Sequence, residues 1–64
     1  MKKFITYYLP NKDIFCIEQT IVNYNNLKRP IIHGGYIINK NCIFETLEDA
    51  KKSLKTNKKI IEIY

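Results

Sequence analysis

The first third of the chain alternates aromatic and β-branched side chains with polar ones, a pattern typical of β-strands. Residues 3–9 (KFITYYL) and residues 14–23 (IFCIEQTIVN) therefore predict two strands. Residues 10–13 (PNKD) predict the turn of a hairpin, because proline presets φ at the first central position and asparagine and aspartate suit the others. On the second strand, we expect the face that carries Phe15 and Ile17 to be the core face.

A third strand is predicted for residues 31–38, which are rich in isoleucine and follow a long loop over residues 24–30. The tripeptide at 33–35 (HGG) interrupts this strand. Two glycines within a strand pattern indicate a bulge or a close backbone contact. Residues 39–41 (NKN) predict a tight turn, since asparagine tolerates positive φ, and residues 42–44 predict a short fourth strand.

The segment between Thr46 and Asn57 predicts a helix. Thr46 is a favourable N-cap, and Asp49 three residues later approximates a capping box. Acidic residues lie in the first turn and lysines lie toward the end, which matches the helix dipole. Asn57 can adopt the left-handed conformation that ends a helix. The apolar stripe expected to face the sheet consists of Leu47, Ala50 and Leu54.

Residues 58–64 (KKIIEIY) predict a last strand, so the order of elements is β-β-β-β-α-β. Runs of strands with one helix favour an α+β fold, in which a small antiparallel sheet carries the helix on one face. The other sheet face would then be open. We expect that face to display a mixture of isoleucine, tyrosine, threonine and glutamate side chains.

Length and composition restrict the class of protein. The 64 residues allow a single domain, residues 1–64, and composition with 45% hydrophobic and 27% charged residues is that of a globular chain. No apolar run approaches the roughly 18 residues of a membrane span. The start at residues 1–3 (MKK) resembles a signal peptide, but residues 4–10 offer no small-residue cleavage site. We therefore expect a cytoplasmic protein.

The two cysteines, Cys16 and Cys42, both fall in predicted strands. In a cytoplasmic protein we expect reduced thiols that behave as small apolar side chains, with a disulfide as the alternative. Together with His33 they make a poor zinc site, because the C-x-x-C spacing is missing. We expect neither a metal nor another cofactor.

His33 and the two glycines after it are the most suggestive place for chemistry. Histidine titrates near physiological pH, and glycines let a backbone approach a phosphate. However, Asp13, Glu18 and Glu45 can reach His33 only through the fold, and phosphate-loop and dinucleotide motifs are absent. We expect a protein that is not an enzyme, with a small enzyme or nucleotide binder centred on His33 as a third hypothesis.

The charge is the most informative feature for function. The formal charge is +5 and the isoelectric point is near 9.3. A run of lysines off the apolar stripe of the predicted helix and just after it could follow phosphates, or could simply keep a small protein soluble. A single arginine in the chain argues against base-specific readout. This basic edge consists of Lys51, Lys52, Lys55, Lys58 and Lys59.

Five tyrosines are many for a chain of this length. On an open sheet face they could stack on single-stranded nucleic acid, or they could form a protein interface, where tyrosine is enriched. We rank contact with another protein, including a second copy in a homodimer, above nucleic acid. The weaker candidate contact residues on the sheet and its loops are Tyr7, Tyr36, Tyr64, Arg29 and His33.

Isoleucine, lysine and asparagine fill 29 of the 64 positions, a bias that fits an AT-rich coding sequence such as those of small phage and mobile-element genes. We therefore expect a small non-enzymatic binding protein. Its target would be a host protein that handles nucleic acid or acts in defence, in the host cytoplasm. The chain would inhibit that target as an anti-CRISPR protein does. The alternative is a direct nucleic-acid-binding protein that uses the basic edge and the tyrosines.

Overall fold

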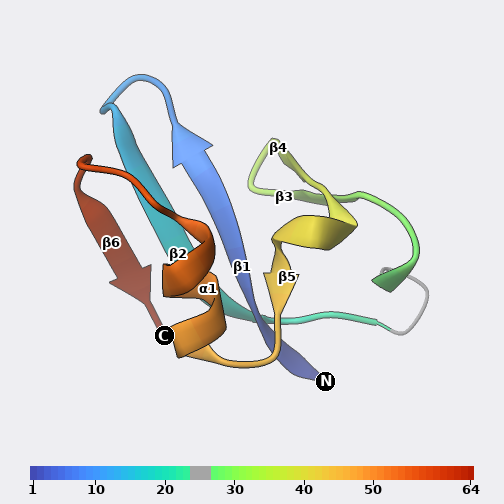
Figure 1. The fold of residues 1–64 in the computed structure, drawn as a ribbon. Coiled ribbons are helices and arrows are strands. Elements are labelled where there is room, and N and C mark those ends of the chain that lie inside the picture. Colours follow the sequence, from blue (N-terminus) through green and yellow to red (C-terminus); the bar gives the residue numbers. More distant parts are fainter. Residues whose placement is uncertain (24–26) are drawn as a thin grey trace.

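A computed structural model describes residues 1–23 and 27–64 and confirms the α+β class (Figure 1). Tyr24 and part of the predicted long loop lie outside the described residues. The elements in chain order are strands β1 (Lys2–Leu9), β2 (Ile14–Ile21), β3 (Ile31–His33) and β4 (Tyr36–Ile38), the 3₁₀ helix η2 (Lys40–Cys42), strand β5 (Ile43–Phe44), helix α1 (Leu47–Ser53) and strand β6 (Ile60–Ile63).

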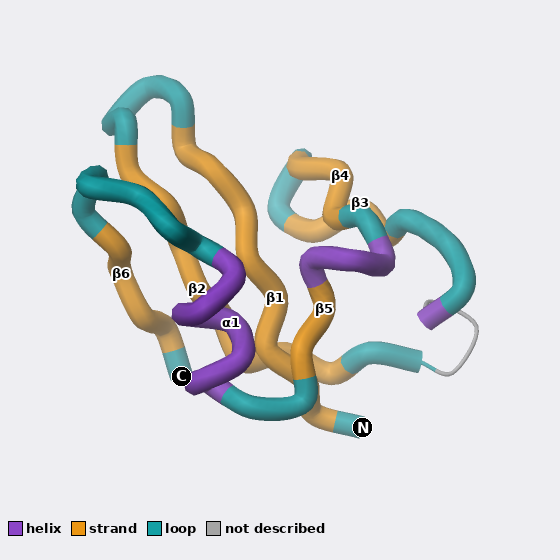
Figure 2. Tube along the Cα trace, viewed as in Figure 1, coloured by secondary structure: helices purple, strands orange, loops and turns teal. Residues whose placement is uncertain are grey.

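The main sheet has the strand order β5-β1-β2-β6. The predicted hairpin of β1 and β2 is present, with Leu9 opposite Ile14, and the Lys12 amide donates to the Leu9 carbonyl in the turn. β5 is antiparallel to β1, and β6 is parallel to β2. β5 and β6 are therefore parallel strands at opposite edges, and α1 is the crossover between them. This connection lays α1 across one face of the sheet (Figure 2).

The helix begins as the sequence predicts but ends earlier. Thr46 Oγ1 accepts a hydrogen bond from the Asp49 amide at 3.1 Å. Ala50 is fully buried, and on the sheet Ile17 and its cross-strand neighbour Thr6 are also buried. The prediction that Asn57 ends the helix is wrong, because Leu54 already leaves helical conformation (φ −95°, ψ 70°).

The predicted third strand is instead a separate hairpin of β3 and β4. Gly34 and Gly35 have φ of +57° and +85°, so they form a two-residue turn rather than a bulge. Positive φ at both central positions matches the twist of the two flanking strands, and glycine adopts it without strain. Likewise, the turn expected at residues 39–41 is replaced by η2, which removes Cys42 from the fourth strand.

The hairpin of β3 and β4 packs on the sheet face opposite α1, so the expectation of an open second face is wrong. Ile38 of β4 is buried with Ile5 and Val22 in a common core cluster. Neighbouring residues of β2, Cys16 and Ile17, are both buried although they point to opposite faces. The prediction of a single core face on β2 fails for the same reason, and Ile21, on the predicted core face, is 67% exposed.

A candidate binding groove at the edge of the sheet

Among the described residues, a strand lies on the outer side of only two of the eight residues of β1. The ladder between β1 and β5 consists of Phe4 opposite Phe44 and Ile5 opposite Ile43. Within the described part of the chain, residues 6–9 pair with β2 alone. Alternate residues of this stretch direct their N–H and C=O groups outward, and such an edge can accept another strand. Figure 1 shows β1 running past the end of β5.

A groove of about 370 Å³ follows this unpaired edge, and we call it the β1 groove. Three consecutive residues of β1 line it. Because consecutive side chains of a strand point to opposite faces, the groove must wrap around the edge of the strand rather than lie on one face. Its lining consists of Thr6, Tyr7 and Tyr8 of β1, Phe15 of β2, Tyr36 and Ile37 of β4, Cys42 of η2, and Leu54.

Aromatic pairs flank the β1 groove on both faces of the sheet. On the hairpin face, Tyr7 stacks on Tyr36 with ring centroids 5.4 Å apart and an interplanar angle of 27°. On the helix face, the rings of Tyr8 and Phe15 lie 5.0 Å apart. Each pair joins residues of two different strands, so the walls of the groove are held by tertiary packing as well as by the strand itself.

A polar cluster behind the hairpin-side wall ties β3 to the sheet. The Tyr7 hydroxyl donates to Glu18 Oε1 at 2.7 Å, and His33 Nε2 lies 2.5 Å from Glu18 Oε2. Of the three carboxylates that the sequence left open as partners of His33, the fold thus selects Glu18. Asp13 pairs with Lys58 and Glu45 with Lys3.

The titration of this cluster reflects its burial. Burial, the Cys16 thiol and the Glu18 carboxylate raise the pKa of the Tyr7 phenol. Burial also raises the pKa of the Cys16 thiol, so the thiolate needed for nucleophilic attack is disfavoured. Both cysteines are free thiols. The geometry of the cluster is that of a structural tether, since both oxygens of Glu18 are engaged by residues of the protein.

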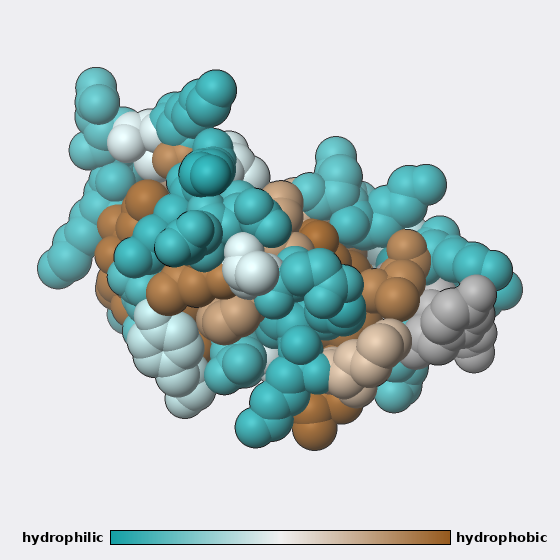
Figure 3. Space-filling model, turned by 60° about the horizontal axis from the view of Figure 1, so that its bottom comes forward, coloured by the Kyte–Doolittle hydropathy of each residue, from teal (hydrophilic) through white to brown (hydrophobic). Residues whose placement is uncertain are grey.

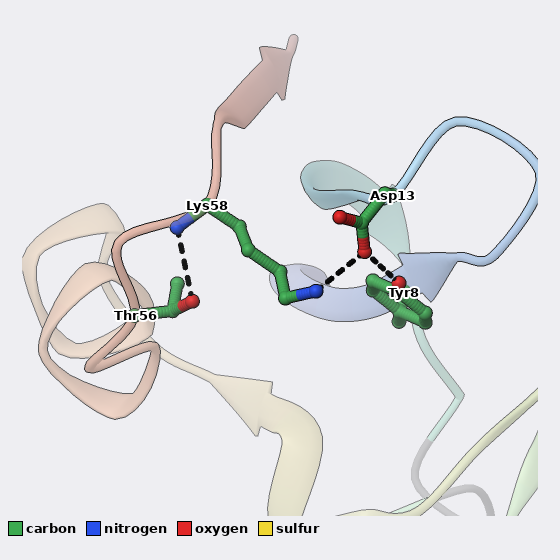
Figure 4. A network of polar contacts seen from close by, with 4 residues as sticks. All are labelled: Tyr8, Asp13, Thr56 and Lys58. Carbon is green, nitrogen blue, oxygen red and sulfur yellow. Dashed lines mark hydrogen bonds and ion pairs between the residues drawn. The ribbon is translucent and has the colours of Figure 1, made fainter.

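A second polar network includes Tyr8 of the groove lining (Figure 4). Asp13, which has a φ of +53°, accepts hydrogen bonds from the Tyr8 hydroxyl and from Lys58 Nζ. Lys58 Nζ also lies 5.5 Å from the centroid of the Tyr8 ring, and the Lys58 amide donates to Thr56 Oγ1. The Lys58 ammonium and the Tyr8 hydroxyl lower the pKa of the Asp13 carboxyl. The network joins the β1–β2 turn to the segment before β6.

The five lysines of the predicted basic edge are all exposed but differ in their partners. Lys51 pairs with Glu62 at 3.3 Å, and Lys58 pairs with Asp13. The other three make no ion pair with residues 1–23 or 27–64; they are Lys52, Lys55 and Lys59. Lys52 and Lys55 line a shallow depression between α1 and β5, which also contains acidic side chains.

The remaining predicted contact residues lie apart from the β1 groove. Tyr64 is 72% exposed, donates to Glu62, and its ring meets that of Phe4 edge-on at 6.4 Å. Arg29 is exposed in the loop before β3. The structure therefore brings Tyr7, Tyr36 and His33 together and leaves Tyr64 and Arg29 elsewhere.

The residues of the groove that sequence reasoning missed are Thr6, Tyr8, Phe15, Ile37, Cys42 and Leu54. The predicted strand at residues 42–44 was an indication of the groove. It is so short that it must leave most of a longer neighbouring strand unpaired. The sequence did not say which strand that neighbour is.

The outer face of the hairpin carries an exposed apolar pair. Ile32 and Ile37 lie directly opposite each other and are 80% and 71% exposed. Ile37 lines the β1 groove and Ile32 does not. Hydrophobic residues are also visible between hydrophilic ones on the face of the molecule shown in Figure 3.

Within the described ranges, no three histidine, cysteine, aspartate or glutamate side chains are placed to hold a metal ion. No helix there combines the length and the apolar character needed to cross a membrane. No protein-family model matches the chain, and searches of curated proteins and of solved structures return no match either.

Proposed function

We propose that this chain is a small non-enzymatic binding protein that attaches to another protein through the β1 groove. The observation that carries the proposal is an unpaired strand edge with an aromatic pair on each side. Tyrosine and phenylalanine are enriched at the cores of protein interfaces, where they supply large contact area at low entropic cost. The proposed location of the protein is the cytoplasm.

The polar groups near the groove favour binding over catalysis. Glu18 holds both Tyr7 and His33, and the raised pKa of Cys16 keeps that buried residue a thiol. A general base or nucleophile needs an available lone pair near the substrate. In the cluster of Tyr7, Glu18 and His33, both carboxylate oxygens of Glu18 are engaged by the other two side chains, and these contacts hold the hairpin of β3 and β4 against the sheet.

The charge of the chain bears on the partner. At +5, the protein is drawn to acidic surfaces and repelled by basic ones. The proposed target is an acidic surface of a host protein that handles nucleic acid or acts in defence. The choice of a host target follows from the expectation that an amino-acid composition typical of AT-rich genes belongs to a phage or mobile element. Inhibition by occupancy is the proposed mode of action.

Site-specific photo-crosslinking in the producing cell tests the proposal. A photoreactive phenylalanine analogue would replace Ile37. In the matched control it would replace Ile32, which is at least as exposed and lies on the same hairpin but outside the groove. We expect a discrete protein adduct from position 37 and little from position 32. Equal adducts from both positions, or adducts to nucleic acid alone, would contradict the proposal.

Direct nucleic-acid binding is the second candidate function. Lys52 and Lys55 favour it, since they lie at one depression without an acidic partner in the described ranges. The acidic residues Glu45 and Asp49 in the same depression oppose it. A salt-dependent binding measurement, described in the Discussion, separates the two candidates.

A further inference from the structure

We infer that the β1 groove receives an extended, acidic segment of the partner, which adds to the sheet as a strand beside residues 6–9 of β1. The inference rests on the proposed function and names the chemistry of its partner. Three features carry it: the backbone edge of β1, the side chains on the two walls of the groove, and the net positive charge of the protein.

The backbone provides the first step. β5 pairs with β1 only as far as Ile43 opposite Ile5, and of η2, which precedes β5, only Cys42 lines the groove beside β1. An added strand would occupy the β1 groove and pair with the outward-facing backbone groups of β1. Four residues of β1 extend over about 13 Å, so two of them can exchange backbone hydrogen bonds with the added strand.

The walls provide the second step. Side chains of an added strand would alternate between the two faces of the sheet. On one face they would meet Tyr36 stacked on Tyr7, and on the other they would meet Phe15 beside Tyr8. Both walls are aromatic, and Leu54 extends the helix-side wall. The bound segment should therefore carry apolar side chains at neighbouring positions, one for each wall.

The charge of the protein provides the third step. The formal net charge is +5, and Asp13, the acidic partner of the Tyr8 hydroxyl, is offset by Lys58, which lies over the Tyr8 ring. Acidic residues flanking the apolar pair would complement this positive charge.

The same charges argue against a second copy of the chain as the occupant. Two copies paired edge to edge through β1 would bring together two chains that each carry a net charge of +5. Like charges across an interface oppose association. A segment of opposite charge from another protein is therefore the better match.

Selection of short random peptides on the immobilised full-length protein tests the inference. We expect selected peptides to contain neighbouring apolar residues flanked by aspartate or glutamate. Their affinity should fall by about tenfold or more for the variant Ile37→Asp, and it should be unchanged for the matched variant Ile32→Asp. Sedimentation of both variants beforehand would confirm that each is folded and would report their oligomeric state.

N-methylation of successive peptide amides then distinguishes strand addition from simple groove binding. A strand pairs through every second residue, so methylation should weaken binding by about tenfold at alternate amides and leave the amides between them unaffected. A uniform effect, or none, would overturn strand addition while leaving the proposed function in place. Selection of peptides with a basic consensus sequence would overturn the inference that the bound segment is acidic.

Two further outcomes would also be decisive. If no selected peptide depends on Ile37, both the inference and the proposed function fail. If the protein is a dimer that Ile37→Asp dissociates and Ile32→Asp does not, the edge belongs to a second copy, and the inferred acidic segment is overturned.

Discussion

His33 Nε2 lies 2.5 Å from Glu18 Oε2, and this contact joins the hairpin of β3 and β4 to the central strand β2. Both side chains are largely buried, with 30% and 19% of their surfaces exposed. A two-stranded hairpin alone is marginal in water, so its position depends on what it packs against. The relationship between the two residues therefore controls the shape of the hairpin-side wall of the β1 groove.

We predict that His33→Ala lowers the free energy of unfolding by about 1–3 kcal/mol, because it leaves Glu18 partly buried without one of its two partners. Urea denaturation measures this loss, and amide hydrogen exchange should show faster opening in β3 and β4 than in β2. Lys12→Ala, in the exposed β1–β2 turn, is the control. Loss of a function with unchanged stability would instead support a catalytic role for His33.

The pKa of Tyr7 is raised in the folded protein, which predicts a loss of stability at alkaline pH. The unfolded chain loses the phenol proton near pH 10.0 and the folded protein only above it. The stabilisation is therefore complete below pH 10.0 and declines as the pH rises further. Urea midpoints measured across this range should fall more steeply for the native protein than for Tyr7→Phe. Parallel curves would contradict the prediction.

The lowered pKa of Asp13 predicts that stability is lost at acidic pH. Its pKa is lowered by Lys58 and Tyr8, so its contribution is present above the ordinary value of 3.8 and is lost as the pH falls through the folded value. Asp13→Asn is the matched variant, since asparagine also tolerates the positive φ at this position. Its deficit in thermal stability at neutral pH should shrink on acidification below pH 3.8; a constant deficit would refute the assignment.

The locally encoded parts of the fold could be predicted from the sequence. The turn at residues 10–13 and the N-cap at Thr46 depend on residues that are neighbours in the chain, and both are confirmed. For Gly34 and Gly35, the local sequence alone could not predict the conformation. A bulge and a two-residue turn both use glycine, and the choice depends on packing against Ile5 and Val22, which are distant in sequence.

The groove could not be predicted because it depends on strand order. The sequence indicated a short strand before the helix but not that it would pair with β1, nor that β6 would be parallel to β2. The unclear alternation along β2 has the same origin, since Cys16 and Ile17 are buried by different elements on opposite faces. Among the candidate residues, Tyr7, Tyr36 and His33 were brought together by contacts between strands that no local pattern encodes.

The contrast between Ala50 and Leu54 tests how α1 packs. Ala50 is fully buried, whereas Leu54 is half-buried beyond the end of the helix. We predict that Ala50→Asp destabilises the protein by about 3 kcal/mol or more, because it places an unpaired charge against the sheet. Leu54→Asp should cost less and should weaken binding in the groove. Chemical denaturation of both variants decides the point, and equal losses would show that Leu54 belongs to the core.

The partners of the lysines make the nucleic-acid hypothesis testable with matched variants. Changing Lys52, Lys55 and Lys59 to glutamate removes three lysines that make no ion pair with the described residues, whereas Lys51→Glu removes one that already pairs with Glu62. Each contact with a phosphate of duplex DNA adds about 0.9 to the slope of affinity against salt concentration on logarithmic axes. If the protein binds nucleic acid through this edge, the triple variant should lose up to about 2.7 of that slope and Lys51→Glu very little.

From the proposed function we expect instead that fluorescence anisotropy detects no tight binding of single- or double-stranded nucleic acid even at low salt. Tight binding that the triple variant abolishes would replace the protein partner by a nucleic acid.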